Sequence, residues 1–440
     1  MPNVVVLGSG MAAAGAASRL VAQGVAPVLY DRNAHHGGLT ASRRDAAGFI
    51  FDKGPHISFT KDTRIQALFA DSVDGEFETI QINLNNYWRG YWPRHPVQLH
   101  LHGLPEDVVV KVIEDFVEER GKPERPVNNY ADWLLASFGR SFADWFPGQY
   151  TRKYHLTTPD NMTTDWLGPR LYRPNLDEVL RGALSPAAPT VHYITHFRYP
   201  RQGGFVSYLR KLLPLEHVRL NHEAVSISAK DRYVRFANGD AARYDTLISS
   251  VALPDLIAMI QDVPADVQEA SRRLACSTCV LVNLGIDRED LSPAHMTYFY
   301  DDDICFTRLG LPHMLSPHNV PPGCGSIQAE VYFSPKYRPL TDPPEALIEP
   351  VIRDLRRCGI LRDDDTILSR GAEVLRYANI IFDLDRPAAL RTVHGFLDDI
   401  GIAYCGRHGE WGYMWTDESF KSGERAADRV LNTLGSHVYA

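Results

Sequence analysis

The six residues Gly8-Ser9-Gly10-Met11-Ala12-Ala13 have the types and spacing needed to hold a diphosphate. Gly8 permits a tight turn, Gly10 lets the main chain approach a pyrophosphate, and the small Ala13 lets a helix pack closely against a strand. The amides that open such a helix present partial positive charge to the phosphates. This G-x-G-x-x-A pattern therefore predicts a dinucleotide-binding turn.

The segments around this turn must be a strand and a helix for the pattern to work. The run Val4–Leu7 is typical of a buried parallel strand, and the Ala-rich segment 12–23 predicts a helix. Residues 27–30 read as a second strand that ends at Asp31. A carboxylate about 20 residues after the glycines is suited to a ribose 2′-hydroxyl and would repel a 2′-phosphate. The context predicts a Rossmann-like unit without choosing between NAD and FAD.

The composition is that of an ordinary globular protein with an acidic balance. The chain has 440 residues, 44% of them hydrophobic, and its 46 basic and 54 acidic residues give a formal charge of −8. Nucleic acid is usually bound through a basic excess, so the charge argues against a nucleic-acid partner.

The distribution of cysteine and apolar residues bears on location. Six scattered cysteines do not form a disulfide framework and fit a reducing compartment. No apolar run approaches the roughly 18 residues needed to cross a bilayer. The apolar start, Val4–Leu7, has nothing basic before it and makes a poor signal peptide. We therefore expect a cytoplasmic protein without a membrane span.

Other chemical patterns are weak or missing in the sequence. Neither H-E-x-x-H nor G-x-S-x-G occurs, so zinc hydrolysis and serine-triad chemistry lack support. Cys276 and Cys279 form one C-x-x-C without a second pair at zinc spacing, and we interpret them as core thiols. Asp301-Asp302-Asp303 is interpreted as a solvated acidic turn. The sequence predicts no metal site.

Further blocks occur along the chain in a fixed order. Gly37-Gly38, just past the second predicted strand, resembles an extended FAD fingerprint. The later blocks are Phe51–Ile57 with its D-x-G-x-H pattern, Tyr150–Lys153, Tyr199–Gly204, Phe306–Arg308 and Gly406–Tyr413. On these blocks the chain resembles the FAD-dependent amine oxidase and protoporphyrinogen-oxidase-like superfamily. Its motif pattern is closest to that of UDP-galactopyranose mutase-like flavoproteins.

The resemblance implies an α/β fold. A Rossmann-like FAD-binding domain of the glutathione-reductase type would be combined with a discontinuous α+β substrate domain. The FAD-binding domain would take residues 1–85, 191–254 and 371–440. A helical insertion over 86–190 and a sheet over 255–370 would form the substrate domain.

Local patterns agree with this division. The apolar spacing in Glu106–Arg120 predicts an amphipathic helix inside the insertion. Strand character returns at Val218–Ser228, Tyr233–Phe236 and Tyr244–Ser249, in a stretch expected to rejoin the FAD sheet. Further predictions are strands at Cys279–Leu284 and Ser326–Phe333 in the substrate sheet, and a final amphipathic helix over residues 419–434.

The resemblance also implies a cofactor site. Val225 would lie against the adenine and His56 against the central flavin ring, while Arg407 would meet a phosphate or the flavin. Main-chain amides after Gly406 would face the flavin edge that gains negative charge on reduction. A structural histidine and a rim salt bridge are the alternative interpretations of His56 and Arg407. The complete predicted set is Gly8, Gly10, Ala13, Asp31, Gly37, Gly38, His56, Val225, Gly406 and Arg407.

Substrate contacts are implied in the same way. Arg308 would hold a substrate diphosphate, because a guanidinium forms bidentate charge-assisted hydrogen bonds. Tyr150 and Tyr413 would contact the substrate through their hydroxyl groups. A surface arginine and core tyrosines are the alternative interpretations. His56, Arg308 and Tyr413 are the predicted catalytic residues.

Three further residues are assigned to substrate binding from local charge or from their position in the family pattern. Arg170 belongs to the basic stretch 169–173, which suits an anionic ligand. His155 and Asp417 match the family pattern in position and differ in residue type. The chain also departs from the mutase pattern at Phe59, where a second histidine is expected, and at Trp415, where a carboxylate is expected.

Two reactions follow from the resemblance. In the first, the enzyme interconverts pyranose and furanose forms of a nucleoside-diphosphate sugar, with reduced flavin N5 attacking the anomeric carbon. In the second, an amine-oxidase-like oxidase or dehydrogenase passes hydride from a small-molecule substrate to flavin N5. FAD is the cofactor in both, the enzyme class stays open between isomerase and oxidoreductase, and a homodimer is one assembly open to the chain.

Overall fold

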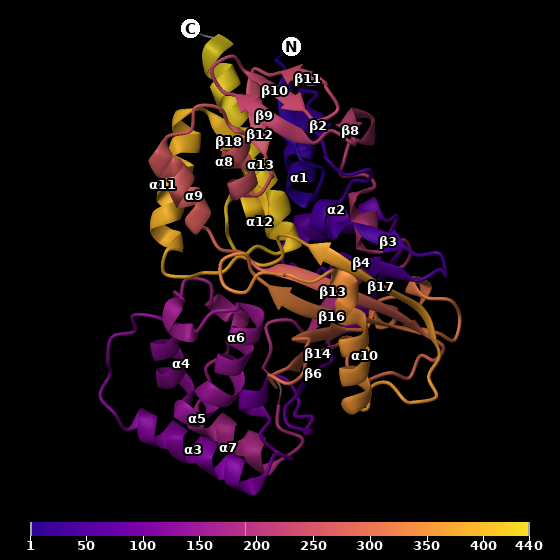
Figure 1. Ribbon diagram of the computed structural model, residues 1–440, viewed down its shortest axis with the longest axis vertical. Helices are drawn as coiled ribbons and strands as arrows, with labels where there is room; N and C mark the ends of the chain where they lie inside the picture. The colour runs from indigo at the N-terminus through magenta and orange to yellow at the C-terminus, as the bar shows by residue number, and fades with distance from the viewer. Residues whose placement is uncertain (1, 190, 439–440) are drawn as a thin grey trace.

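The computed structural model describes residues 2–189 and 191–438, and it divides into three parts along the long axis (Figure 1). A parallel sheet with its helices lies at one end, a six-stranded sheet crosses the middle, and a helical lobe lies at the other end. The predicted domain limits at 1, 190 and 440 fall outside the described residues.

The parallel sheet carries the dinucleotide motif. Its strand order is β18-β12-β1-β2-β8, with bounds Ile402–Tyr404, Thr246–Ser249, Val4–Leu7, Val28–Tyr30 and Val218–Arg219. Because side chains alternate along a strand, Val4 and Val6 join a different core from Val5 and Leu7. The first core includes α1 (Met11–Ala22) and α13 (Thr416–Val438), and the second includes α8 (Leu253–Met259), α9 (Ala265–Arg273) and α11 (Arg386–Asp399).

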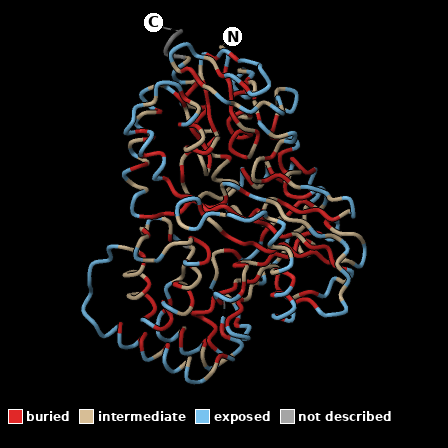
Figure 2. Tube along the Cα trace, viewed as in Figure 1, coloured by how far each residue is buried: buried red, intermediate tan, exposed pale blue. Residues whose placement is uncertain are grey.

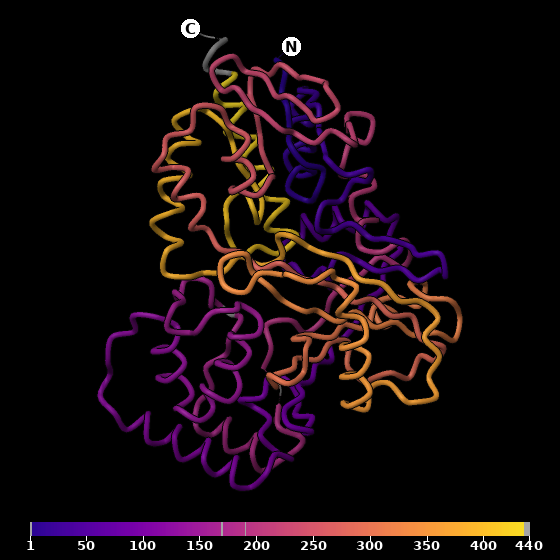
Figure 3. Tube along the Cα trace, viewed as in Figure 1, coloured from indigo at the N-terminus to yellow at the C-terminus, as the bar shows by residue number. Residues whose placement is uncertain are grey.

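The first and last helices of the described chain pack directly on each other. A Cβ atom at Gly15 would collide with the carbonyl of Phe420, and one at Gly423 would collide with the carbonyl of Ala12. The two glycines therefore allow contact between the backbones of α1 and α13. Figure 3 shows the indigo start and the yellow end of the trace side by side. The final helix is longer at both ends than the predicted 419–434.

The segment between β8 and β12 only partly joins the parallel sheet. The predicted strand Val218–Ser228 is broken by a turn in which Asn221 has a φ of 57°. After the break, β9 (Ala224–Ser228), β10 (Tyr233–Phe236) and β11 (Ala241–Arg243) form an antiparallel sheet of their own. The left-handed residue at 221 is the local reason for the difference.

The six-stranded sheet forms one wall of the site. Its order is β17-β13-β16-β15-β14-β6, with bounds Ile367–Leu375, Thr278–Ile286, Gly325–Phe333, Arg308–Gly310, Met296–Phe299 and Leu84–Tyr87. Strands β6 and β17 carry it beyond the predicted range 255–370 at both ends. Alternating residues such as Val280 and Val331 form a core with α10 (Ile348–Arg357), while Cys279, Leu281 and Tyr332 face the opposite side.

The helical lobe has its own aromatic core. Its helices are α3 (Glu106–Arg120), α4 (Tyr130–Phe138), α5 (Arg140–Ala143), α6 (Gln149–Tyr154) and α7 (Leu176–Leu184). The bounds of α3 are those predicted from its apolar spacing. Trp88, Phe138 and Phe146 are among its buried side chains. Figure 2 shows the resulting buried interior and exposed outer turns.

Shorter elements complete the fold. They are α2 (Thr63–Ser72), α12 (Gly406–Gly409), the pair β3 (Ser42–Arg44) and β4 (Ile50–Asp52), and the pair β5 (Phe77–Gln81) and β7 (His196–Pro200). Within residues 2–189 and 191–438, no helix has the length and apolar character that crossing a membrane requires.

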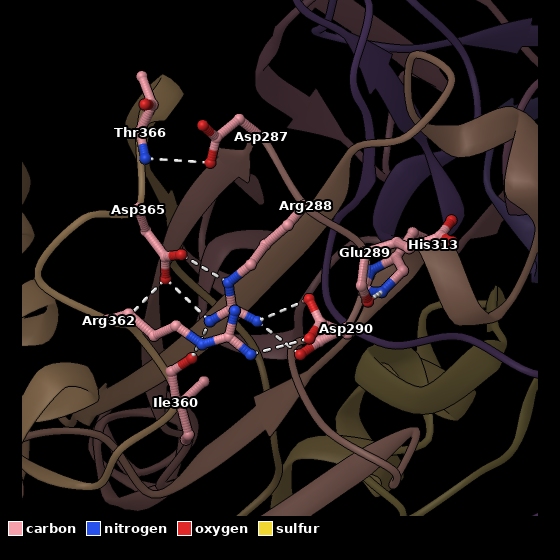
Figure 4. A network of polar contacts seen from close by, with 9 residues as sticks. All are labelled: Asp287, Arg288, Glu289, Asp290, His313, Ile360, Arg362, Asp365 and Thr366. Carbon is pink, nitrogen blue, oxygen red and sulfur yellow. Dashed lines mark hydrogen bonds and ion pairs between the residues drawn. The ribbon is translucent and has the colours of Figure 1, made fainter.

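A charged cluster connects the segment after β13 to the segment before β17, at one end of the six-stranded sheet (Figure 4). Arg288 donates from Nε and Nη2 to Asp365 at 2.5 and 2.9 Å, and from Nη2 to the Ile360 carbonyl at 2.9 Å. The Asp365 side chain is 4% exposed, so the pair is largely shielded from water.

Candidate functional site

A single cavity of about 1210 Å³ connects the three parts of the molecule. It begins at the parallel sheet, passes the loops around Gly54 and Gly406, and ends between the helical lobe and the six-stranded sheet. Fourteen of the sixteen predicted site residues line it: Gly8, Gly10, Asp31, Gly37, Gly38, His56, Tyr150, His155, Arg170, Val225, Arg308, Gly406, Arg407 and Tyr413. Ala13 and Asp417 are outside the wall.

The glycine turn leaves space where a side chain would otherwise lie. Gly8 has a φ of +107°, and a Cβ atom there would collide with Ser250 Oγ. Gly10 caps the N-terminus of α1, so the first amides of this helix face the turn. Ala13 is fully buried and packs with the core of the sheet, as its small size requires.

The second glycine pair packs against the first. The Gly37 amide donates to the Ser9 carbonyl at 2.9 Å, and Gly37 and Gly38 both have positive φ values, +110° and +56°. Two main-chain segments therefore form one cradle without side chains between them. This cradle, the helix terminus and the long cavity fit an extended dinucleotide such as FAD.

Asp31 reaches the cradle, but its carboxylate is already fully hydrogen-bonded. Oδ2 accepts from Ser9 N and Ser9 Oγ at 2.9 and 2.6 Å. Oδ1 accepts from Asn33 N and Asn33 Nδ2 at 2.9 and 2.8 Å. A carboxylate offers about four lone-pair positions, so a ribose hydroxyl would have to displace one of these donors.

His56 and Arg407 lie where the flavin is predicted. His56 Nδ1 donates to the Gly54 carbonyl at 2.9 Å, and burial lowers the pKa of His56 to about 4. The imidazole is therefore neutral at pH 7 and presents Nε2 as an acceptor. Arg407 donates to the carbonyl of Met414 at 3.1 and 2.6 Å, and to Asn379 Oδ1 at 3.2 Å. Its guanidinium thus also holds the loop that carries Tyr413.

Arg308 forms a buried ion pair at the substrate end of the cavity. Its Nε lies 3.0 and 2.9 Å from the two carboxylate oxygens of Glu330, and Nη2 lies 2.9 Å from one of them. The two residues are register partners on β15 and β16. Burial alone would lower the pKa of Arg308, but Glu330 holds it well above the usual range. The contacts to Glu330 use Nε and Nη2 but not Nη1, and Tyr298 also forms a side-chain hydrogen bond with Arg308.

Tyrosines surround this pair. Tyr332 donates its hydroxyl to Glu330, and Tyr298 is the register partner of Arg308 on β14. The hydroxyls of Tyr154 and Tyr413 are 3.5 Å apart. Burial raises the pKa values of Tyr150 and Tyr154 well above their usual range, so both phenols remain hydrogen-bond donors at neutral pH.

Arg170 joins the helical lobe to the C-terminal segment. Its guanidinium carbon lies 4.4 Å from the ring centre of Tyr413 and 5.0 Å from that of Trp415. It also donates to the carbonyls of Trp166 and Tyr413 at 2.9 and 3.1 Å. Its buried Nε has no hydrogen-bond partner among the described residues.

His155 and Asp417 have different surroundings. His155 is 3% exposed, contacts the rings of Tyr154 and Trp166, and its Nδ1 has no hydrogen-bond partner in the described part of the chain. Asp417 instead accepts a hydrogen bond from Thr60 Oγ1 at 2.6 Å and pairs with Lys421 at 3.7 Å. These partners lie outside the cavity wall, and the substrate contact of Asp417 stays a prediction.

Sequence reasoning missed several residues of the substrate end. Tyr154, Tyr298, Glu330 and Tyr332 all line the cavity. An available signal was Glu330 within the otherwise mainly apolar strand Gly325–Phe333, because a charge in a buried strand requires a partner.

Sequence comparisons place the N-terminal part in a dinucleotide-binding family. Residues 6–72 match the NAD(P)-binding Rossmann-like domain. Over 349 residues the chain is 25% identical to a 4,4'-diapolycopene oxygenase of Methylomonas sp. The matched region covers 68% of this chain and 66% of that protein. A 4,4'-diaponeurosporene oxygenase of Staphylococcus aureus is 33% identical over 92 residues, which is 21% of this chain and 18% of that protein. Both matches span less than two thirds of the relatives' own length.

Solved structures extend the likeness to the whole chain. A reduced UDP-galactopyranose mutase is 27% identical, with a TM-score of 0.91, and the match covers 98% of this chain and 96% of the mutase. A putative protoporphyrinogen oxidase from Exiguobacterium sp. 255-15 has a TM-score of 0.73 at 15% identity, with 98% of each chain covered. The second likeness shows the fold alone.

Fold and cradle together define a flavoenzyme that uses FAD. The matched family model, the sequence relatives and the mutase likeness together support the FAD-dependent amine-oxidase-like superfamily. The predictions of this superfamily, of FAD, of an enzyme and of an α/β fold with a Rossmann-like domain are confirmed.

Proposed function

We propose that this flavoenzyme rearranges a nucleoside-diphosphate sugar without net oxidation, as a mutase that depends on reduced FAD. The charge at the substrate end carries the proposal. Arg170 and Arg308 line this end with Glu330. The other carboxylates of the described lining, Asp31, Glu223 and Asp255, are carried by the part of the molecule that holds the parallel sheet. Since Glu330 is paired with Arg308, the surplus charge is positive and suits an anionic substrate. A protonated amine would be repelled.

The size of the cavity supports a second ligand beside the cofactor. Its volume of about 1210 Å³ exceeds the roughly 300–1,000 Å³ typical of a single ligand pocket. The likeness to reduced UDP-galactopyranose mutase over 98% of this chain supports a sugar nucleotide as that ligand.

The residues at this end would serve the departure of a diphosphate. When bound, reduced FAD supplies an electron-rich N5 to the anomeric carbon of the sugar. Arg308, fixed by Glu330, presents Nη1 to the diphosphate, whose negative charge grows as its bond to the sugar breaks. Arg170 adds a second positive charge. These fixed charges would stabilise the transition state more than the ground state.

The protonated phenols and the neutral His56 would assist without acting as strong bases. Tyr150 and Tyr154 donate hydrogen bonds to oxygen atoms, because their raised pKa values keep the phenolate form rare. His56 presents an acceptor near the predicted flavin and adds no charge there at pH 7.

An anaerobic assay tests the proposal. The FAD-loaded enzyme would be incubated with UDP-galactopyranose and other nucleoside-diphosphate hexoses, with and without dithionite, and the products separated by chromatography and mass spectrometry. We expect a product of unchanged mass that forms only with dithionite. A product two hydrogens lighter, formed without dithionite, would reject the mutase.

The aromatic lining favours one alternative reaction. Phe59 and Trp415 meet edge to face, with ring centres 4.9 Å apart, and both line the cavity. Such a wall also suits oxidation of an apolar substrate, and the relatives matched by sequence are named as oxygenases. Under this alternative, oxidised enzyme would bleach on mixing with substrate and recover its colour in air.

A further inference from the structure

Lys153 is a buried lysine that the proposed chemistry does not use. It lies on α6, between Tyr150 and Tyr154, and is 7% exposed. Its ammonium group donates to three main-chain carbonyls, those of Asp301, Ile304 and Phe306, at 2.6, 3.0 and 2.9 Å. All three donors of the ammonium group are therefore satisfied by one loop.

That loop leads directly into the strand that carries Arg308. The next residue, Thr307, donates its amide to the Glu330 carbonyl at 2.9 Å and accepts from the Phe299 amide at 2.9 Å. Arg308 follows as the first residue of β15. Lys153 thus connects the helix of Tyr150 and Tyr154 to the segment that sets the position of the guanidinium.

The chemistry of the contact favours lysine in its charged form. Three converging carbonyl oxygens match an ammonium group, while a neutral amine would turn a lone pair toward one of them. Burial lowers the pKa of Lys153 to about 8, and the charges of Asp301, Asp302 and Asp303 oppose this shift. The group is therefore mostly charged at pH 7.

We propose that Lys153 is a positioning residue for diphosphate binding. It fixes the separation between the phenols of α6 and the guanidinium of Arg308, which belong to different parts of the molecule. This inference rests on the proposed function, because it assumes that both groups hold the same diphosphate. We call the three hydrogen bonds from Lys153 to this loop the clamp. Without the clamp, Arg308 and the phenols would no longer be held at the separation that one diphosphate requires.

Lys336 provides a matched control. It also makes three contacts, to the Arg273 carbonyl at 3.0 Å, Asp383 at 2.8 Å and Asp385 at 2.9 Å. It does not line the cavity. Replacing either lysine by methionine removes three hydrogen bonds from the folded protein, but only Lys153 is connected to Arg308.

The test measures the affinity of reduced, FAD-loaded enzyme for UDP through the flavin absorbance. We expect Lys153→Met to raise the Kd roughly 10- to 100-fold, as expected for misplaced binding groups, and Lys336→Met to leave it within about 3-fold. Lys153→Gln, which keeps two N–H donors, should show a smaller rise and serves if the methionine variant does not fold. An unchanged Kd in a folded Lys153 variant would overturn the proposal.

Hydrogen exchange of residues 301–308 separates this inference from the proposed function. If wild-type enzyme fails to bind UDP, the proposed function fails, and the exchange data then decide the role of Lys153. Faster exchange in Lys153→Met than in Lys336→Met supports the clamp. Equal exchange in the two variants rejects it.

Discussion

The two ends of the cavity differ in whether main-chain atoms or side chains form the binding groups. At the nucleotide end, main-chain atoms and glycines from two short sequence blocks form the cradle, around Gly8 and Gly37. At the substrate end, side chains converge from β14, β15, β16, α6 and the loop around Tyr413. The first end depends on the absence of side chains, whereas the second depends on charged and aromatic groups held by one another.

This difference predicts different responses to substitution. A change that moves the main chain of the cradle should strongly weaken FAD binding, because every main-chain donor moves together. A change in the substrate end should leave FAD bound and alter only the second ligand. The following variants are ordered from the largest expected effect to the smallest.

Gly8→Ala should give the largest effect, a nearly colourless protein. The added Cβ would collide with Ser250 Oγ at a residue whose φ is +107°. The ratio of flavin to protein absorbance after incubation with FAD measures the loss, expected to exceed about 100-fold in affinity given strain and steric exclusion together. Gly239→Ala is the control, since Gly239 also has a positive φ, +94°, but has nothing within 4 Å. Equal flavin loss in both variants would contradict the cradle.

Arg308→Met should keep the yellow colour and weaken UDP binding by about 100-fold, the size expected for a lost charge-assisted pair. Arg288→Met removes a comparable shielded arginine–carboxylate pair, and neither Arg288 nor Asp365 lines the cavity. Both changes leave a carboxylate unpaired and should lower the free energy of unfolding by roughly 3–5 kcal/mol. Denaturant titration and UDP titration of both variants check the expectation. A similar loss of UDP binding in Arg288→Met would show that only stability is involved.

Asp31→Ala should weaken FAD binding about 10-fold, because Ser9 and Asn33 lose the carboxylate that orders them. Ser9→Ala separates a direct contact between Asp31 and the ribose from an effect of Asp31 on the turn. It frees one lone pair of Asp31 for the ribose, so FAD affinity should stay equal or increase. Fluorescence titration of the apoprotein with FAD measures both. If Ser9→Ala weakens binding as strongly as Asp31→Ala, the carboxylate acts only by ordering the turn.

Lowering the pH should decrease the free energy of unfolding, because buried histidines such as His155 stay neutral in the folded protein. Burial lowers the pKa of His155 to about 3, whereas the unfolded chain titrates near 6.5. Between these values the unfolded state binds more protons, so stability falls as the pH drops, by at most about 1.4 kcal/mol per pH unit for this group. Asp52, whose pKa burial raises to about 6, acts in the opposite direction below that pH.

Unfolding of wild type and His155→Gln between pH 7 and pH 5 measures this contribution. The variant should show a shallower fall in the free energy of unfolding with decreasing pH. Parallel curves would mean that His155 binds protons equally in the folded and unfolded states, so that burial does not lower its pKa.

Asp417→Asn should have the smallest effect. The residue pairs with Thr60 and Lys421 and is not part of the cavity wall. UDP affinity should stay within about 2-fold, and loss of a carboxylate in the first turn of α13 should cost about 0.3–1 kcal/mol of stability. A large loss of UDP affinity would restore the substrate contact predicted from its sequence position.

The contrast between the two ends also explains what the sequence could predict. The glycine cradle is local, so the spacing of Gly8, Gly10 and Asp31 was enough to predict it. The helix Glu106–Arg120 was equally clear because its apolar period is regular.

The substrate end could not be derived in the same way. The pairing of Arg308 with Glu330 depends on the register of β15 and β16, which lie far apart in the sequence. Likewise, the turn at Asn221 that divides the predicted strand Val218–Ser228 depends on a single left-handed residue. Family resemblance supplied Arg308 and Tyr413, while Tyr154 and Tyr298 came only from the folded chain.

The close seating of α13 on α1 has a consequence for biosynthesis. The pyrophosphate cradle at residues 8–13 is made about 400 residues before the helix that backs it, at residues 416–438. The cofactor cradle therefore lacks its backing helix until residues 416–438 have been made and have packed against α1.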